Sequence, residues 1–469
     1  MNFFTKSTLH FSENIAIINE EGVETTYADL YNFSKILAKH IPTRSLILSL
    51  NKNSLGSIVG YFSFLNNKVI PLMIDAKIDI QLINGLIDNY KPSYLWIPTN
   101  KLTDFPNTVL VCELLDYSLL KFENHKIHNI HYDLGLLLTT SGSTGSPKVV
   151  KISYENIQSN AFSIIKYLSL DSNEKPITTL PMSYSFGLSI INSHLFVGAT
   201  ILLTDRSIFE KEFWTFLKKE KATSISGVPY TYDILNKLRF TRMELPHLKT
   251  LTQAGGKINK TLHRDFAEFC KKSKKRFFVM YGQTEATARM SYLPCDQALS
   301  KIGSIGIPIP DGKFNLINEN SKNIEKTNTV GELIYEGPNV CMGYAESIKD
   351  LSENDKNQGK LLTGDLAKMD EDGFYYIVGR KKRFLKIFGN RINLDKLEGL
   401  LKEITTDCAC TGNDEKIVVY ITEELKTEKI RDYISSKLRL HHSIFSINII
   451  EEIPKSSSGK TIYSELKIY

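Results

Sequence analysis

A short run rich in glycine and small hydroxyl residues, TTSGSTGSPK at residues 139–148, is the first candidate for chemistry. Serine and threonine hydroxyls surround Gly142 and Gly145, and the run ends on Lys148. Such a composition is poor for a helix or a strand, so it predicts a loop whose backbone closely approaches another group. Hydroxyls, backbone N–H groups and one cation are the groups that bind phosphate.

This run does not match the Walker pattern of nucleotide triphosphatases, which needs G-x-x-x-x-G-K-[ST]. Lys148 follows Ser-Pro rather than a glycine. The later stretch PKSSSGKT (454–461) ends correctly on Gly-Lys-Thr, but Pro454 stands where the first glycine is required. A Walker-type ATPase is therefore disfavoured.

Further motifs follow in order along the chain: YGQTEAT (281–287), GELIYEGPNVCMGY (331–344), LTGDLA (362–367), GRKKRFLKIFGNRI (379–392) and PKSSSGK (454–460). Together with 139–148 they resemble the adenylate-forming, or AMP-binding, superfamily, which includes acyl-CoA synthetases, nonribosomal peptide synthetase adenylation domains and luciferases. The resemblance is clear from about residue 135 to the C-terminus and loose before it. It implies that a carboxylate attacks the α-phosphorus of ATP, pyrophosphate leaves, and the acyl group of the acyl-adenylate passes to a thiol.

The resemblance implies a nucleotide site in the first part of the chain. Thr284 would hydrogen-bond the α-phosphate, and Glu285 would bind Mg²⁺, which neutralises phosphate charge. Tyr281 would stack on adenine. Lys148 would add charge to the phosphate loop or anchor it. The other residues placed at the nucleotide are those of the phosphate loop and three later glycines: Thr140, Ser141, Gly142, Ser143, Thr144, Gly145, Gly255, Gly256 and Gly282.

The later motifs imply roles for the C-terminal part. Asp365 would accept both ribose hydroxyls, and Arg380 would reach the same ribose or the phosphates. Lys460 would be the catalytic lysine, with its ammonium between the carboxylate and the α-phosphate. Lys382 would be the hinge residue, and Gly389 would line the tunnel for a pantetheine thiol.

The chain departs from the family pattern near the acyl site. PMSYSFG (181–187) has Tyr184 where many acyl-CoA synthetases have a histidine, which puts gating and acyl selectivity in doubt. The segment also lacks the aspartate that pairs with an α-ammonium group, so an α-amino acid is disfavoured. The chain is short for the family, which favours a small or medium acid over a long-chain one. Residues near Phe186, Tyr230 and Gly282 are expected to form pocket walls.

The elements that position these motifs follow from apolar spacing. Residues 27–40 and 56–68 have helical spacing, while 45–50 and 69–74 are short apolar runs typical of buried strands. This alternation predicts βαβ units and a parallel sheet. It predicts a further helix at 155–168 and further strands at 93–97, 108–112, 134–140, 149–153, 177–182, 199–204, 223–229, 250–256 and 276–282.

The pattern of apolar and charged residues changes twice along the chain. From about residue 300 the apolar residues alternate at period two, which predicts a β-rich subdomain at about 300–380. After about 380, lysines and glutamates surround short apolar runs. We therefore expect an α/β chain of several subdomains, with a large N-terminal domain at 1–380 and a small, mobile α+β domain at 381–469. The resemblance implies that the small domain rotates between an adenylating and a thiol-transfer pose.

Composition limits the class of protein. The 469 residues are 42% hydrophobic and 23% charged, which is typical of soluble globular proteins. A net charge of +6 suits anionic small molecules, and the basic runs at 271–277 and 381–384 lack the aromatic interleaving of a nucleic-acid site. We expect no secretory leader, because the first 30 residues lack a basic stretch followed by an unbroken apolar one, and no run approaches about 20 apolar residues. The six cysteines form no CxxC, so we expect reduced thiols and a cytoplasmic protein. From the apolar and basic runs described above, we expect neither a membrane nor a nucleic-acid partner.

The sequence therefore predicts an ATP- and Mg²⁺-dependent ligase for a small carboxylic acid. Its acyl acceptor would be coenzyme A or the phosphopantetheine of a separate acyl carrier protein. Three alternatives stay open: a non-catalytic nucleotide-binding scaffold, an amino-acid-activating carrier-protein ligase, and an oxygenase of the luciferase kind. The scaffold is disfavoured because the polar set is intact at Thr284, Glu285, Asp365, Arg380 and Lys460.

Overall fold

A computed structural model describes residues 3–4, 9–123, 128–139, 148–387, 390–405, 407–413, 415–423, 427–438, 440–455 and 461–466. The predicted site residues Thr140 to Gly145, Gly389 and Lys460 lie outside these ranges. The chain divides into two compact units. Unit 1 comprises 1–142, 146–313 and 336–361, and unit 2 comprises 143–145, 314–335 and 362–469.

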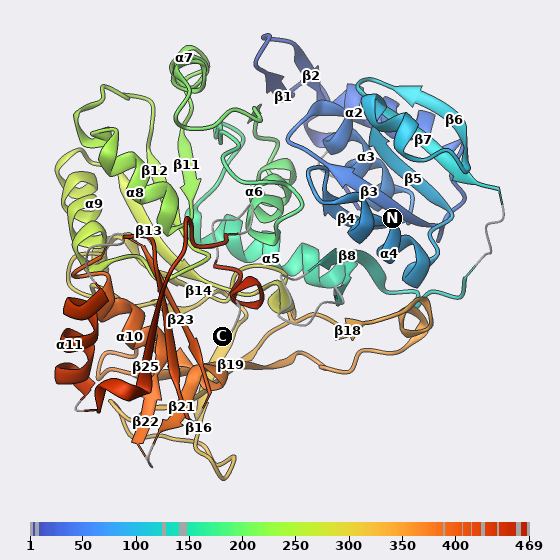
Figure 1. Ribbon diagram of the computed structural model, residues 1–469. Helices are drawn as coiled ribbons and strands as arrows, with labels where there is room; N and C mark the ends of the chain where they lie inside the picture. Colours follow the sequence, from blue (N-terminus) through green and yellow to red (C-terminus); the bar gives the residue numbers. More distant parts are fainter. Residues whose placement is uncertain are drawn as a thin grey trace. The chain divides into compact units, whose positions relative to one another are not determined.

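The largest sheet of unit 1 runs in the order β18-β9-β8-β4-β3-β5-β7-β6 (Figure 1). Strands β3, β4, β5 and β8 are parallel, whereas β9 pairs antiparallel with β8 and β7 with β5. Its strands are β3 (Leu46–Asn51), β4 (Ile70–Asp75), β5 (Tyr94–Pro98), β6 (Thr108–Leu114), β7 (Tyr117–Phe122), β8 (Leu134–Thr139), β9 (Val149–Ser153) and β18 (Tyr344–Ala345).

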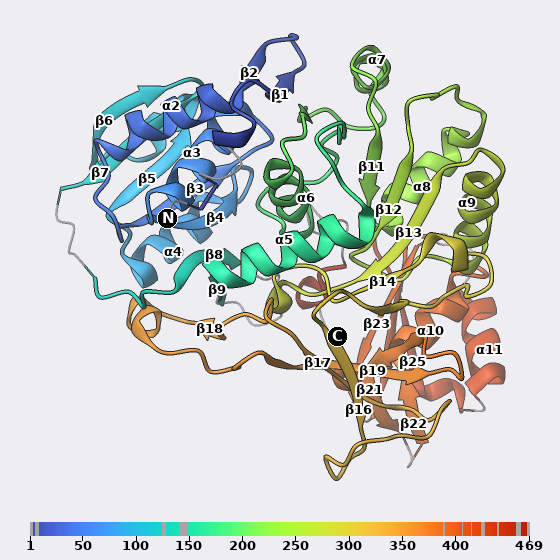
Figure 2. The same ribbon diagram turned by 180° about the vertical axis from the view of Figure 1, so that it is seen from behind.

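The helices of this sheet begin at local capping signals. Thr26 caps α2 (Tyr27–Ala38) through a capping box with Asp29, and Ser153 caps α5 (Tyr154–Leu168) in the same way with Asn156. Figure 2 shows α5 running beside β8 and β9. The remaining helices are α3 (Leu55–Asn66), which is buried along almost its whole length, α4 (Ile80–Tyr90) and α6 (Ser185–Phe196).

A second sheet of unit 1 leads into the YGQTEAT motif at the end of β13 and into Gly255 and Gly256 after β12. It runs in the order β11-β12-β13-β14-β15, with β11, β12 and β13 parallel and the last pairs antiparallel. Helices α8 and α9 lie beside these strands in Figures 1 and 2. The elements are β11 (Ser224–Gly227), α8 (Pro229–Lys237), β12 (Thr250–Gln253), α9 (Lys260–Lys272), β13 (Arg276–Tyr281), β14 (Ser291–Leu293) and β15 (Ile307–Pro308).

A third, small sheet completes unit 1. It has the order β10-β1-β2, in which β1 is parallel to β10 and antiparallel to β2. Its strands and the helix that follows them are β1 (Ile15–Asn19), β2 (Glu24–Thr26), β10 (Ile201–Leu203) and α7 (Lys211–Lys219).

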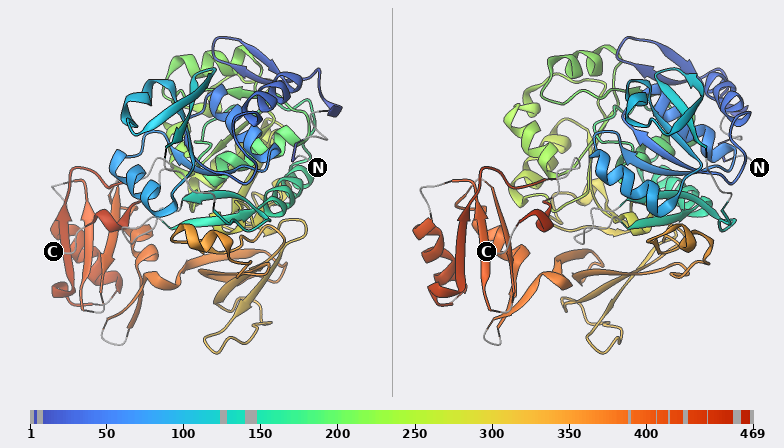
Figure 3. Two further views of the ribbon diagram at one scale, coloured as in Figure 1. Left: turned by 90° about the vertical axis from the view of Figure 1, so that its right-hand side faces the viewer. Right: turned by 45° about the vertical axis from the view of Figure 1, so that its right-hand side comes forward.

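Unit 2 is built from antiparallel strands and a small α+β layer. The order β16-β17-β19-β20 forms one sheet, β21 pairs with β22, and β23-β24-β25 forms another sheet. Helices α10 and α11 pack on the last of these through a cluster of buried aliphatic residues, and Figure 3 shows these orange and red elements together from two sides. The elements are β16 (Lys313–Ile317), β17 (Gly331–Glu336), β19 (Lys360–Met369), β20 (Tyr375–Arg380), β21 (Phe384–Ile387), β22 (Asn390–Asn393), α10 (Leu394–Leu401), β23 (Cys408–Gly412), β24 (Ile417–Ile421), α11 (Thr427–Leu438) and β25 (Phe445–Ile449).

The expected α/β class with a β-rich part and a small α+β part is confirmed. The expected strand at 177–182 is wrong, because this segment makes only the isolated bridges of Pro176 with Ser224 and of Ile177 with Leu202. The parallel sheet is also interrupted by antiparallel pairs at its ends. The domain boundary at residue 380 stays a prediction. Among the helices in the described ranges, none is long and apolar enough to cross a membrane.

Candidate functional site

The YGQTEAT motif forms a tight turn directly after β13. Gly282 is confined there, because a Cβ at this position would lie 1.6 Å from the carbonyl oxygen of Ala288. Only a residue without a side chain fits this approach of two backbones. A short 3-10 helix, η3 (Thr284–Ala286), follows and ends on Thr287, which has φ 62°.

Asn339 supports this turn from the GELIYEGPNVCMGY motif. Its buried side-chain amide donates to the carbonyl oxygens of Ala286 (2.8 Å) and Arg289 (3.0 Å). Its own carbonyl accepts from the Thr287 hydroxyl at 2.7 Å. Positive φ is unfavourable for a β-branched residue, and these hydrogen bonds stabilise the conformation of Thr287. The turn is therefore held in one geometry by two distant motifs.

Two side chains of the turn project toward separate polar partners. The Thr284 hydroxyl lies 3.2 Å from that of Ser185, the first residue of α6. The N-terminus of a helix favours negative charge, so Thr284 stands where a phosphate oxygen would be stabilised. The Glu285 carboxylate accepts a hydrogen bond of 2.5 Å from the hydroxyl of Tyr344. Burial and this carboxylate raise the pKa of Tyr344, which keeps the phenol a donor.

Glu285 suits the magnesium role in its chemistry. Mg²⁺ prefers oxygen ligands and is usually held by one or two carboxylates together with substrate phosphates and water. Within the described ranges, no three His, Cys, Asp or Glu side chains gather into a protein-only metal site. The half-buried Glu285 carboxylate therefore fits a metal that would arrive with the nucleotide.

The glycine pair after β12 lies beside Tyr184. Gly255 has φ +82°, and a Cβ there would lie 2.6 Å from the Tyr184 hydroxyl. Burial raises the pKa of Tyr184 to about 12, so this side chain is a neutral phenol. Gly256 would bring a Cβ within 3.0 Å of Pro229. The tyrosine that replaces the family histidine thus packs on the backbone that the resemblance places next to adenine.

The other predicted residues of unit 1 differ in their polar partners and in their burial. The Lys148 ammonium lies 2.5 Å from the Glu346 carboxylate, a geometry that suits the anchoring alternative. The Tyr281 hydroxyl accepts from the Gln283 amide at 3.2 Å. Phe186 is buried with the Arg289 guanidinium 5.0 Å from its ring centroid, whereas Tyr230 is 46% exposed.

In unit 2, strand pairing brings the two predicted ribose residues together. Asp365 on β19 is the register partner of Arg380 at the end of β20. The Arg380 Nε lies 3.4 Å from the Asp365 Oδ1, and Asp365 is buried while most of the Arg380 side chain is exposed. A carboxylate with two acceptor oxygens beside an exposed cation can bind vicinal hydroxyls and an adjacent phosphate.

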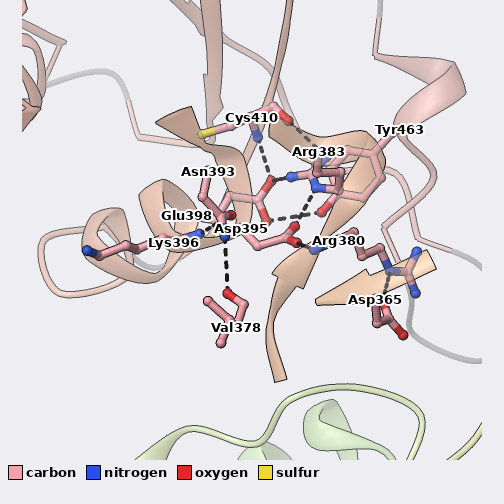
Figure 4. Close-up of polar contacts among 10 residues, drawn as sticks. All are labelled: Asp365, Val378, Arg380, Arg383, Asn393, Asp395, Lys396, Glu398, Cys410 and Tyr463. Carbon is pink, nitrogen blue, oxygen red and sulfur yellow. Dashed lines mark hydrogen bonds and ion pairs between the residues drawn. The ribbon is translucent and has the colours of Figure 1, made fainter. Parts of the chain in front are cut away.

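The predicted hinge lies in the short 3-10 helix η6 (Lys381–Arg383) directly after Arg380. Lys382 is exposed. Its neighbours both form ion pairs: the exposed Lys381 pairs with the buried Glu332 at 2.7 Å, and the mostly buried Arg383 pairs with Asp395 and Glu398 (Figure 4). Of the three basic residues, Lys382 is the one whose side chain lies in solvent with no ion pair to another described residue.

A family model for AMP-binding enzymes matches residues 4–345. The chain belongs to the AMP-binding enzyme family. Among curated relatives it is similar to a 2-succinylbenzoate–CoA ligase of Oceanobacillus iheyensis, with 26% identity over 96% of this chain and 95% of the relative. Another 2-succinylbenzoate–CoA ligase, from Listeria innocua, is 22% identical over 95% of each chain.

Solved structures have the same fold as this AMP-binding enzyme. O-succinylbenzoate coenzyme A synthetase from Bacillus subtilis in complex with AMP superposes with a TM-score of 0.82 at 20% identity, over 100% of this chain and 98% of the other. The same enzyme in complex with ATP and magnesium ion gives 0.81 at 20% identity, over 99% of each chain. With the family model and the curated relatives, the chain is an adenylate-forming enzyme of the ligase class.

Several residues of this AMP-binding enzyme that support the site were not singled out from sequence. Ser185, Asn339 and Tyr344 each contact the turn at Thr284–Thr287 from between 52 and 99 residues away along the chain. Asn339 and Tyr344 stand inside a recognised motif, and Ser185 stands inside the segment PMSYSFG (181–187) that was compared with the family pattern, so position within these segments is a usable signal. The roles of all the predicted site residues stay predictions.

Proposed function

We propose that this chain adenylates a small non-amino carboxylic acid with ATP and transfers the acyl group to coenzyme A. The observation that carries the proposal is the turn at Thr284–Glu285, which is held rigid by Gly282 and Asn339 in a chain of the AMP-binding family. Electrostatic stabilisation of the α-phosphoryl group needs donors fixed before the reaction, and this turn supplies them.

The proposed roles divide between the two units. Thr284 and the N-terminus of α6 stabilise charge on the α-phosphate, and Glu285 orients the magnesium ion that neutralises the phosphates. Asp365 and Arg380 bind the ribose, and Lys460 stabilises the pentacovalent transition state and the departing pyrophosphate. The carboxylate oxygen forms the new bond to phosphorus while the bond to the pyrophosphate oxygen breaks. The thiol of coenzyme A then displaces AMP from the acyl carbon.

An aromatic dicarboxylate such as 2-succinylbenzoate is the first acid we propose as substrate. Relatives that align along nearly the whole chain bear the name of that ligase. The segment with Tyr184 has no carboxylate to pair with an α-ammonium, so amino acids stay disfavoured. Carrier-protein phosphopantetheine is the alternative acceptor.

The test is pyrophosphate release with ATP and Mg²⁺ over a panel of acids: 2-succinylbenzoate, aryl, short-chain, medium-chain and amino acids. We expect release with one class of acid, and a loss of about 10²–10³-fold in Lys460→Ala. Lys429→Ala, an exposed lysine of α11, is the matched control and should leave the rate unchanged. Addition of coenzyme A or a carrier protein then identifies the acceptor. ATP binding without release from any acid would overturn the proposal in favour of the scaffold.

A further inference from the structure

Arg289 is a buried cation whose partners in the described part of the chain are all uncharged. It stands five positions after Thr284, and 2% of the residue is exposed. Its Nε donates to the Ser189 hydroxyl at 3.2 Å, and its Nη1 donates to the Tyr167 hydroxyl at 2.8 Å and to the Met280 sulfur at 3.3 Å. The two N–H groups of Nη2 make no hydrogen bond to a residue that the structure describes.

A guanidinium in these surroundings is unfavourable until an anion joins it. Arginine stays protonated in proteins, and a buried charge is normally paired with an opposite charge. The Phe186 ring, with its centroid 5.0 Å from the guanidinium carbon, compensates less than an anion does. Burial and, to a smaller extent, the charge of Arg289 lower the pKa of His194 on α6 to about 4. The charge of Arg289 therefore acts on its surroundings without a described carboxylate to neutralise it.

Helix α6 sets the position of this cation relative to Thr284. The Thr284 hydroxyl lies 3.2 Å from that of Ser185 in the first turn of α6, and Arg289 Nε lies 3.2 Å from the hydroxyl of Ser189, four residues later. Four residues of an α-helix rise about 6 Å. The Arg289 backbone is also fixed, because its carbonyl accepts from the Asn339 side-chain amide at 3.0 Å. The proposed phosphate donor and the cation therefore contact successive turns of one helix.

We propose that Arg289 binds the second carboxylate of the acid substrate, the one that is not adenylated. This inference rests on the proposed function and adds the residue that selects a diacid over a monoacid. A carboxylate can accept paired hydrogen bonds from a guanidinium, and the pairing compensates both buried charges. With the reacting carboxylate beside Thr284, the second one lies about 6 Å away along α6. Straight-chain diacids such as adipate and the aryl diacid 2-succinylbenzoate are acids of this kind.

The test measures kcat/KM for adenylation with acids matched except for the second carboxylate. 2-Succinylbenzoate is compared with 3-benzoylpropionate, which lacks the ring carboxylate, and adipate is compared with hexanoate. In the pair that reacts, we expect the wild type to prefer the diacid about 100-fold, because the monoacid leaves Arg289 without an anion. Arg289→Met should lower kcat/KM for the diacid about 100-fold and leave that for the monoacid nearly unchanged.

Arg276→Met is the matched control. Arg276 begins β13 of the second sheet of unit 1 and lies 3.9 Å from a carboxylate of its own, Glu174. This variant should keep the wild-type preference for the diacid. Arg289→Lys keeps the charge and loses the planar array of donors, so it should retain a preference of about tenfold. If Arg289→Met does not fold, an undiminished preference in Arg289→Lys overturns the inference.

The outcomes separate this inference from the proposed function. A wild type that adenylates the diacid and its monoacid equally well would overturn the role of Arg289 and leave the adenylation proposal standing. An equal fall for both acids in Arg289→Met would do the same, because a merely structural role affects both acids alike. A wild type that forms no adenylate from any acid would overturn the proposed function, and this inference with it.

Discussion

The turn at 282–287 and the cluster around Arg383 are both motif regions, but they are held by different forces. The turn depends on backbone approach, with a Cβ at Gly282 excluded by Ala288 and with neutral hydrogen bonds from Asn339. The cluster depends on charged side chains, with Arg383 between two carboxylates. Steric exclusion acts within a fraction of an ångström, so no residue with a Cβ can replace Gly282 without a shift of the backbone. Charge pairing acts over a longer range and needs a complete set of partners.

The difference indicates how each region serves the reaction that we propose. A turn that must present Thr284 and Glu285 in one geometry is built from backbone packing. A segment next to a proposed hinge is built from side-chain pairs, which can separate and form again. The following changes test this contrast, from the largest expected effect to the smallest.

Gly282→Ala should be the most damaging single change. The added Cβ would lie 1.6 Å from the Ala288 carbonyl oxygen, so the backbone of the turn must shift. We expect a loss of about 4 kcal/mol in the free energy of unfolding and no measurable pyrophosphate release. Gly85→Ala in α4 is the control, because a Cβ there meets nothing within 4 Å. That variant should gain about 0.5–1 kcal/mol. A fully active Gly282→Ala enzyme would contradict the steric account.

Arg383→Ala should cause the next largest loss in the free energy of unfolding. It leaves Asp395 and Glu398 without their cation in a mostly buried setting, which costs about 3–5 kcal/mol. Urea denaturation of the full chain measures the cost. Lys356→Ala breaks the exposed pair with Glu353 and should cost at most about 1 kcal/mol. Equal effects of the two variants would show that the buried cluster contributes no more than a surface pair.

Low pH should lower the free energy of unfolding, because it protonates His194, a buried residue of α6. Burial, with a smaller contribution from Arg289, lowers the pKa of this imidazole to about 4, against about 6.5 in an unfolded chain. Between these values the unfolded chain binds a proton that the folded chain excludes. Stability therefore falls as pH drops from about 6.5 toward 4, by up to about 3 kcal/mol from this group.

Urea midpoints measured across this pH range for wild type and His194→Asn provide the check. The variant should show a shallower decline with acid, whatever its stability at neutral pH. Parallel pH profiles for the two proteins would exclude His194 as the cause.

Tyr344→Phe should have the smallest effect. It removes the hydroxyl that donates to Glu285 and leaves the ring. Residues that orient a metal ligand typically change metal affinity by about tenfold or more. We expect the Mg²⁺ concentration for half-maximal pyrophosphate release to rise about tenfold, with kcat nearly unchanged at saturating Mg²⁺. An unchanged Mg²⁺ dependence would separate Tyr344 from the proposed metal role of Glu285.

The sequence by itself determined the class of fold and the family. Helical spacing at 27–40 became α2, and the apolar runs at 45–50 and 69–74 became β3 and β4. These features are local, since side-chain periodicity and capping depend on residues within a few positions of one another. The ordered motifs carry the AMP-binding resemblance without tertiary information, because loops that approach a ligand constrain residue type strongly.

Only the tertiary structure decided which distant residues meet. Ser185 reaches Thr284, Tyr344 reaches Glu285, and Tyr463 reaches Glu398 across 59 to 99 residues. The segment at 177–182 shows the same limit, since its apolar run suits a strand, yet it makes only isolated bridges. The physical reason is that such pairings depend on which faces are buried together and on the entropy of closing long loops, and neither is encoded in a short window of residues.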